Sequence, residues 1–124
     1  MEPTPTKETV ELTTESGTLR RRGEWVVPRL LRIRSQAGAV RLDMSQARIA
    51  HPVVDIELSV LSGSIVLVLP DGATADLDRL HSPHASHRSR VPAVPTHQAP
   101  HFVLSGETYT GALRVRYARG HRRR

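Results

Sequence analysis

The stretch VVDIELSVLSGSIVLVLPDG, Val53 to Gly72, is the most hydrophobic part of the chain, and one small step, Ser62-Gly63-Ser64, interrupts it. Before the step the apolar residues fall on even numbers up to Val60, and after it they fall on odd numbers from Ile65. Alternation of this kind is typical of β-strands with one buried face. A straight strand cannot change parity without turning its apolar side to water. We therefore expect a corner at Gly63, because glycine adopts the backbone angles that a bend, bulge or turn needs.

Similar small-glycine-small steps recur elsewhere in the chain, centred on Gly17, Gly38 and Gly111. The spacing is about 20 to 25 residues, within the range of repeated structural units. The gap from Gly63 to Gly111 is twice as long, and a missing step would fall near residue 85, in PHASHRSR. The period predicts an all-β fold of short stacked strands, either β-solenoid-like or a rolled sheet. Four unrelated glycine turns in a β-sandwich are the alternative.

Period-two alternation defines the expected strands and their buried faces. It occurs in LLRIRS, AVRLDMS, VDIELSV and LRVRYA. The residues expected to point inward are Leu31, Ile33, Val40, Leu42, Met44, Val54, Ile56, Leu58, Val60, Leu113, Val115 and Tyr117. The segment SIVLVL is apolar on both faces, which favours the central position in a sheet. Because aromatic residues make up 3% of the chain, aliphatic side chains must build the core.

Composition divides the chain into segments. Residues 1–15 are rich in Thr and Glu and are expected to form a disordered lead-in. Residues 16–120 form the single expected β domain, in which the Pro- and His-rich segment 81–100 is a long loop. Residues 121–124 are a basic tail that we expect to be mobile. The sequence shows neither a secretory signal pattern nor a membrane-spanning apolar run, so we expect a cytoplasmic protein, with peripheral attachment to the membrane left open.

The net charge is +6, and of the 18 basic residues only Lys7 is not arginine. Several arginines alternate with buried positions and should point outward, and others follow in the tail. The candidate anion- or partner-binding surface comprises Arg32, Arg34, Arg41, Arg114, Arg116, Arg119, Arg122, Arg123 and Arg124. Such a surface attracts nucleic acid, anionic lipid or wall polymer. A merely solvated face in an arginine-biased chain is the other interpretation.

No other group of residues in the sequence predicts a catalytic or metal-binding site. His81, His84 and His87 would share one face of a helix and could bind zinc or nickel. However, Pro83 lies between the first two, and a solvated loop is the simpler interpretation. No serine stands in a nucleophile elbow, so we expect no catalytic residues, no cofactor, no metal and no enzyme. Trp25 is expected to serve as a core or cap residue.

The segment GEWVVPRLLRIRSQAGAVRLDMSQARIAHPVVDIELSVLSGSIVLVLPDG, with APHFVLSGETYTGALRVR after it, resembles a known domain. It is similar to the β-rich C-terminal domain of a small uncharacterised family from GC-rich bacteria, in which a short helical domain usually comes first. That domain is in turn distantly similar to the C-terminal domain of cell wall-active antibiotics response proteins. The resemblance covers about residues 16–120, lacks the helical domain, and departs from the pattern at PHASHRS.

The resemblance implies a non-enzymatic interaction or regulatory domain linked to the cell-envelope stress response, with a protein partner whose identity is open. It brings no catalytic residues. The alternative is an electrostatic module that binds nucleic acid or an anionic surface. No aromatic residues interleave with the arginines, which disfavours a single-strand binder that stacks bases. No recognition helix is expected, which disfavours reading of the DNA major groove by a helix.

Overall fold

The computed structural model describes residues 9–81, 84–95 and 99–118, and for residues 84–87 the backbone alone. Within these ranges the chain is all-β, without a helix, and every strand pair is parallel. The first sheet has the order β1 (Thr9–Thr14), β4 (Leu30–Ser35), β7 (Val53–Val60), β11 (His101–Thr108) and β9 (Thr74–His81). The second has the order β10 (His84–Ser89), β12 (Thr110–Tyr117), β8 (Ser64–Leu69), β5 (Ala39–Asp43) and β2 (Thr18–Arg21). A third sheet pairs β3 (Val26–Val27) with β6 (Arg48–Ile49).

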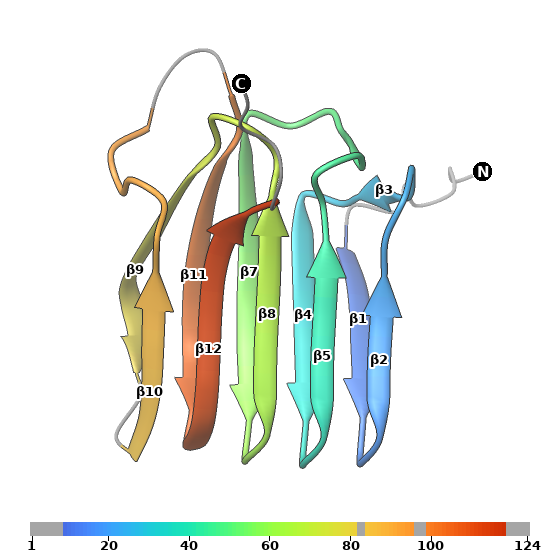
Figure 1. Ribbon diagram of the computed structural model, residues 1–124, viewed down its shortest axis with the longest axis vertical. Helices are drawn as coiled ribbons and strands as arrows, with labels where there is room; N and C mark the ends of the chain where they lie inside the picture. The colour runs from blue at the N-terminus through green and yellow to red at the C-terminus, as the bar shows by residue number, and fades with distance from the viewer. Residues whose placement is uncertain (1–8, 82–83, 96–98, 119–124) are drawn as a thin grey trace, which may run out of the picture.

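Glycine corners connect the two large sheets. At each corner a strand of the first sheet is followed at once by a strand of the second, so that the sheets lie face to face (Figure 1). Gly63 has a φ of 109°, and a Cβ at this residue would lie 2.2 Å from the carbonyl oxygen of Gly38. At Gly111 the corresponding distance to the Gly63 carbonyl oxygen is 1.9 Å. The predicted corner at Gly63 is confirmed, and close backbone approach excludes a side chain there.

The core lies between the two large sheets and is aliphatic except for Phe102. Alternation predicted its composition well, since Leu31, Ile33 and the even-numbered residues of β7 are all buried. Tyr117 is half-buried at the end of β12 rather than fully buried. The strand β8 is the third of five in its sheet, which confirms the central position predicted from its two apolar faces.

The predicted fold class is wrong in its arrangement. Units stacked in chain order would make one solenoid or one rolled sheet, and a sandwich would be the alternative, but the strands form three separate parallel sheets. In these sheets β11 lies between β7 and β9, and β12 lies between β8 and β10, so the last two strand pairs are out of chain order. Close packing at the corner gives the reason. The unit that packs beside Gly63 needs a glycine, which Gly111 supplies and which the 84–89 segment lacks.

The predicted disordered and loop segments also need correction. Part of the lead-in, Thr9–Thr14, is the strand β1, which pairs with β4 over its whole length. Part of the predicted 81–100 loop, His84–Ser89, is the strand β10, which pairs with β12. Composition misled here because Thr, His and Ser contribute little apolar surface, whereas pairing to an existing sheet edge satisfies their backbone groups. Residues 1–8 and the basic tail 121–124 lie outside the described residues.

Candidate anion-binding surface

One row of residues crosses the outer face of the second sheet. The strand register aligns Arg88 with Arg114, Arg114 with Val66, Val66 with Arg41, and Arg41 with Arg20. Aligned residues of a parallel sheet project from the same face. Because the flanking residues of β5, Val40 and Leu42, are buried in the core, this row faces outward. All four arginines of the row are exposed.

A second row lies two residues further along the strands. Its register aligns Asp43 of β5 with Val68 of β8, and Val68 with Arg116 of β12. Arg90 follows in this row, because its N–H donates to the carbonyl oxygen of Val115 at 2.8 Å and continues the ladder beyond β10. We call the six residues of the two rows the arginine face: Arg20, Arg41, Arg88, Arg90, Arg114 and Arg116. Neighbouring strands are about 4.8 Å apart, and successive outward residues are about 6.7 Å apart along a strand. The backbone positions of the six arginines therefore form a two-dimensional array, which Val66 and the buried Val68 interrupt.

The arginine face is poor in compensating negative charge. Within the described ranges, no carboxylate lies within ion-pair distance of Arg20, Arg41, Arg88, Arg90 or Arg114. Asp43 lies on this face, two residues after Arg41 and in the row of Arg116, and its Oδ1 accepts hydrogen bonds from the Ser45 N–H at 3.0 Å and the Ser45 hydroxyl at 2.6 Å. Like charges directly opposite each other on neighbouring strands are destabilising. The chain thus maintains an unfavourable arrangement at two places, Arg88 beside Arg114 and Arg20 beside Arg41.

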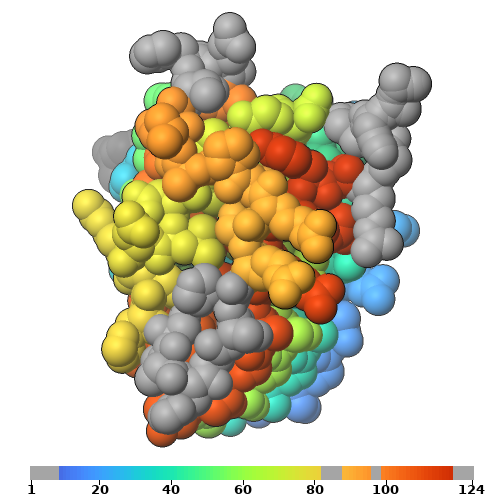
Figure 2. Space-filling model, turned by 60° about the vertical axis from the view of Figure 1, so that its left-hand side comes forward, coloured from blue at the N-terminus to red at the C-terminus, as the bar shows by residue number. Residues whose placement is uncertain are grey.

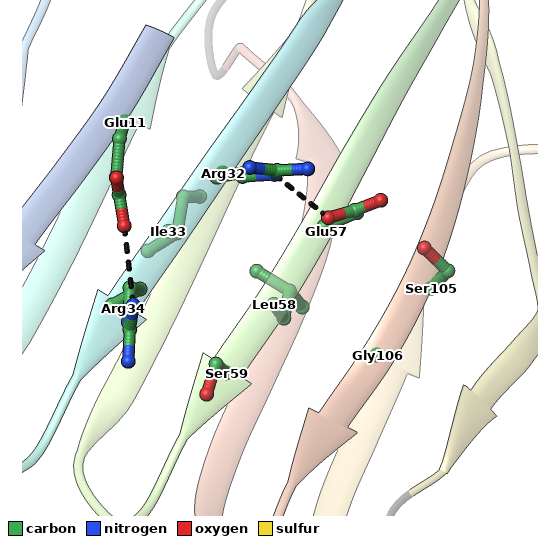
Figure 3. A pocket seen from close by; sticks show the side chains of 9 residues that line it. All are labelled: Glu11, Arg32, Ile33, Arg34, Glu57, Leu58, Ser59, Ser105 and Gly106. Atoms are coloured by element: carbon green, nitrogen blue, oxygen red, sulfur yellow. Dashed lines mark hydrogen bonds and ion pairs between the residues drawn. The ribbon is translucent and has the colours of Figure 1, made fainter. Parts of the chain in front are cut away.

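The outer face of the first sheet is built differently. The register there aligns Glu11 with Arg32, Arg32 with Glu57, and Glu57 with Ser105. The Arg32 Nε lies 3.0 Å from the Glu57 Oε1, and the Arg34 Nη1 lies 3.5 Å from the Glu11 Oε2. Figure 3 shows both ion pairs in a shallow depression that they line together with side chains of β7 and β11. Positive charge on this face is largely neutralised by neighbouring carboxylates.

The predicted arginine surface is therefore divided between two opposite faces. Arg41, Arg114 and Arg116 come together on the second sheet, whereas Arg32 and Arg34 lie on the first. The sequence analysis placed these arginines on one surface, but the corner at Gly38 sends β4 and β5 into different sheets. The tail candidates Arg119, Arg122, Arg123 and Arg124 lie outside the described residues.

Three residues of the arginine face were missed by the sequence reasoning: Arg20, Arg88 and Arg90. A signal for two of them was present. Arg20, Arg41 and Arg114 each stand three residues after a corner glycine. Arg88 stands three residues after Ala85, which pairs with Gly111 in the register. If the sequence is aligned on the four corner glycines, and on residue 85 as a fifth corner, the residues of the first row fall at the same position of each repeat.

The structure does not assemble a second candidate site from the other residues that the sequence analysis considered. The side chains of His84 and His87 lie outside the described part of the chain, and the described residues contain no group of three His, Cys, Asp or Glu that could hold a metal ion. Trp25 packs against the core and donates its Nε1–H to the Asp43 carbonyl oxygen at 3.0 Å. The described part of the chain also contains no helix long and apolar enough to cross a membrane.

Tyr117 ends the strand that carries Arg114 and Arg116. Its hydroxyl donates to the Ala73 carbonyl oxygen at 2.6 Å, which ties the end of β12 to the turn before β9. Burial raises the pKa of the Tyr117 hydroxyl above 10.0, and the negative charge of Asp71 raises it further. The neutral, hydrogen-bonding form is therefore favoured in the folded protein.

Comparisons with protein-family models, with curated proteins and with solved structures give no match for this chain. The resemblance noted from the sequence stays a prediction, and the geometry of the two outer faces is the basis for the proposal that follows.

Proposed function

We propose that this chain is a non-enzymatic interaction domain that docks on an anionic lipid surface through the arginine face. The observation that carries the proposal is the contrast in cross-strand charge. On the first sheet Arg32 lies between Glu11 and Glu57, whereas on the second sheet Arg114 lies beside Arg88 without a neighbouring carboxylate among the described residues. An external anion would relieve this repulsion, as the carboxylates of the first sheet relieve theirs.

The shape of the array favours a flat partner. The arginines project from one face of a five-stranded sheet, and the row spans about 19 Å at the usual strand spacing. A plane of lipid head groups can contact the exposed arginines of the first row, Arg20, Arg41, Arg88 and Arg114, at once. A DNA duplex is convex, and the arginine face offers neither a helix for the major groove nor an aromatic side chain for stacking on bases. The geometry therefore favours a membrane surface over nucleic acid.

The expected affinity is modest. A basic residue close to an anionic membrane contributes about 1 kcal/mol, so six arginines supply at most about 6 kcal/mol, which corresponds to a dissociation constant near 0.1 mM or somewhat tighter. The sequence carries four further arginines after Tyr117, and each adds attraction of the same kind. Reversible peripheral attachment at the cytoplasmic leaflet suits a domain that acts in envelope-stress signalling. A protein partner would then bind either the membrane-attached or the free form.

The test is binding of the full chain to vesicles of phosphatidylglycerol and phosphatidylcholine, measured by co-sedimentation between roughly 50 and 200 mM salt. We expect binding to the mixed vesicles that weakens steadily as salt rises, and no binding to phosphatidylcholine alone. Absence of binding to the mixed vesicles at the lowest salt would overturn the proposal. Tighter binding to duplex DNA than to the vesicles, at equal phosphate concentration, would assign the face to nucleic acid instead.

A further inference from the structure

The arginine face has two unequal ends. At one end, Arg20 lies beside Arg41 on the strands β2 and β5. At the other end, β10, the residue after it and β12 bring four arginines together. Arg88 is aligned with Arg114, and the hydrogen bond from the Arg90 N–H to the Val115 carbonyl oxygen continues the ladder and places Arg90 next to Arg116. Val66 lies between the two ends in the first row. We call Arg88, Arg90, Arg114 and Arg116 the four-arginine cluster.

The cluster is compact. The Cα atoms of its residues are about 4.8 Å apart across the strands and about 6.7 Å apart along them. Arg88, Arg90 and Arg114 are exposed, and Arg116 is half-buried. The Arg116 Nη1 donates to the Tyr117 carbonyl oxygen at 3.1 Å, which restricts the orientation of that guanidinium group. Figure 2 shows β10, in orange, at the surface of this end of the molecule, between β9 in yellow and β12 in red.

The chemistry of the cluster selects for phosphate rather than for isolated carboxylates. Guanidinium groups form two parallel hydrogen bonds to phosphate oxygens, and such charge-assisted bonds are about twice as strong as neutral ones. A single carboxylate would neutralise only one of the three exposed arginines, Arg88, Arg90 and Arg114. A ligand with several adjacent phosphates can pair with more than one of these guanidinium groups at once.

We propose that the four-arginine cluster is a binding site for ligands that carry two or more adjacent phosphates. The inference rests on the proposed function in that the site is part of the same face. It adds a class of ligand that a uniform basic surface would not prefer. The phosphates can belong to a free polyphosphate or to a multiply phosphorylated lipid head group, and the experiment below separates these sources.

The test is calorimetric titration of the full chain with inorganic tripolyphosphate and, separately, with inorganic phosphate. Two double variants are compared: Arg88→Gln with Arg114→Gln, inside the cluster, and Arg20→Gln with Arg41→Gln, at the other end of the face. Both pairs remove the same charge from aligned neighbouring residues, so the second pair is a matched control. Neither exchange touches the core, and melting curves verify the fold of each variant.

We expect tripolyphosphate to bind the wild type more tightly than phosphate. The cluster variant should lose at least about tenfold in affinity, whereas the control should lose no more than about threefold. Equal losses in both variants would show that only net charge matters and would overturn the inference. The same conclusion would follow if tripolyphosphate did not bind the wild type.

Vesicles provide the second arm of the experiment. If vesicles with phosphatidylinositol bisphosphate bind more tightly than phosphatidylglycerol vesicles of equal total charge, the ligand is a lipid head group. Equal vesicle binding, together with tripolyphosphate binding that depends on the cluster, identifies a free polyphosphate. Vesicle binding without any tripolyphosphate binding would remove the cluster site and keep the proposed function. Tripolyphosphate binding without vesicle binding would overturn the proposed function and keep the cluster site.

Discussion

The two outer faces of this protein are built on the same kind of sheet and differ in the charges that lie next to their arginines. Both are the outward sides of five-stranded parallel sheets joined by the same corners. On the first face Arg32 has Glu57 at 3.0 Å, and Arg34 has Glu11 at 3.5 Å. On the second, Arg88 lies opposite Arg114, and Arg20 lies opposite Arg41. The difference teaches that the fold itself does not require unbalanced charge. The like-charged pairs of the second face, Arg88 with Arg114 and Arg20 with Arg41, are the basis for the proposed docking surface.

The ion pairs of the first face also show what such pairs contribute. The side chains of Arg32 and Glu57 are 50% and 47% exposed, so the pair is screened by solvent and stabilises the fold by less than about 1 kcal/mol. The repulsion on the second face is of the same modest order. The folded state tolerates a repulsion of this size, and the proposed binding of an anionic surface would relieve it.

The largest expected effect comes from Gly63→Val, which disturbs both faces at once. The new Cβ would lie 2.2 Å from the Gly38 carbonyl oxygen, and φ is 109°. Because a backbone atom cannot move aside cheaply, we expect a loss of about 3 kcal/mol or more. The melting temperature should fall by roughly 10 °C or more. An unchanged melting temperature would mean that the corners do not hold the rows in register.

Gly17→Ala measures the backbone strain of a corner that lacks the close contact. Gly17 has a φ of 90°, but a Cβ there would meet no atom within 4 Å. Only the backbone strain remains, and we expect a loss of about 1 kcal/mol. If Gly17→Ala and Gly63→Val cost the same, close packing of the corners would be excluded as the cause.

A smaller effect is expected from Tyr117→Phe, which loosens the end of β12 beneath the arginine face. The variant loses the hydrogen bond to the Ala73 carbonyl oxygen, and we expect a cost of about 1 kcal/mol at neutral pH. The pKa of Tyr117 is raised in the folded state. Its stabilising contribution is therefore complete below pH 10 and is lost as the pH rises through the folded-state pKa. Melting curves between neutral and alkaline pH should fall less steeply for Tyr117→Phe than for the wild type, and parallel curves would contradict this account.

The smallest effect compares the two faces most directly. Exchange of arginine for glutamate should change the free energy of unfolding in opposite directions on the two faces. Arg32→Glu places a third carboxylate between Glu11 and Glu57 and should destabilise the fold by about 0.5 kcal/mol. Arg114→Glu places a carboxylate beside Arg88 and should stabilise the fold by a similar amount. Net charge changes equally in both variants, so chemical denaturation at low salt isolates the local partners. Shifts of the same sign would contradict the contrast between the faces.

Much of the fold could be predicted because period-two alternation is a local property. Leu31, Ile33 and the β7 residues needed no knowledge of their neighbours to be assigned to the core. The corner at Gly63 followed from the change of parity. Which strands are neighbours is a long-range property. The position of β11 beside β7 depends on Gly111 packing against Gly63, and the sequence shows no contact between them.

The candidate site was harder to predict for the same reason. Outward orientation of Arg32, Arg41 and Arg114 could be inferred from each strand alone. Their division between two sheets depends on the corners, which send alternate strands to opposite sides. Arg88 lies in a segment whose composition predicted a loop, because an edge strand with polar side chains is stabilised by backbone pairing to β12 rather than by an apolar face of its own.

The most direct test of the central claim is to remove two arginines from each face in turn and to measure binding to phosphatidylglycerol vesicles. The pair Arg41→Gln and Arg114→Gln belongs to the arginine face, and the pair Arg32→Gln and Arg34→Gln belongs to the first sheet. Both pairs lower the net charge equally. We predict a loss of roughly 30-fold in vesicle affinity for the first pair, at about 1 kcal/mol per arginine, and less than about threefold for the second. Equal losses, or a larger loss from the Arg32 and Arg34 pair, would show that the second sheet is not the binding face.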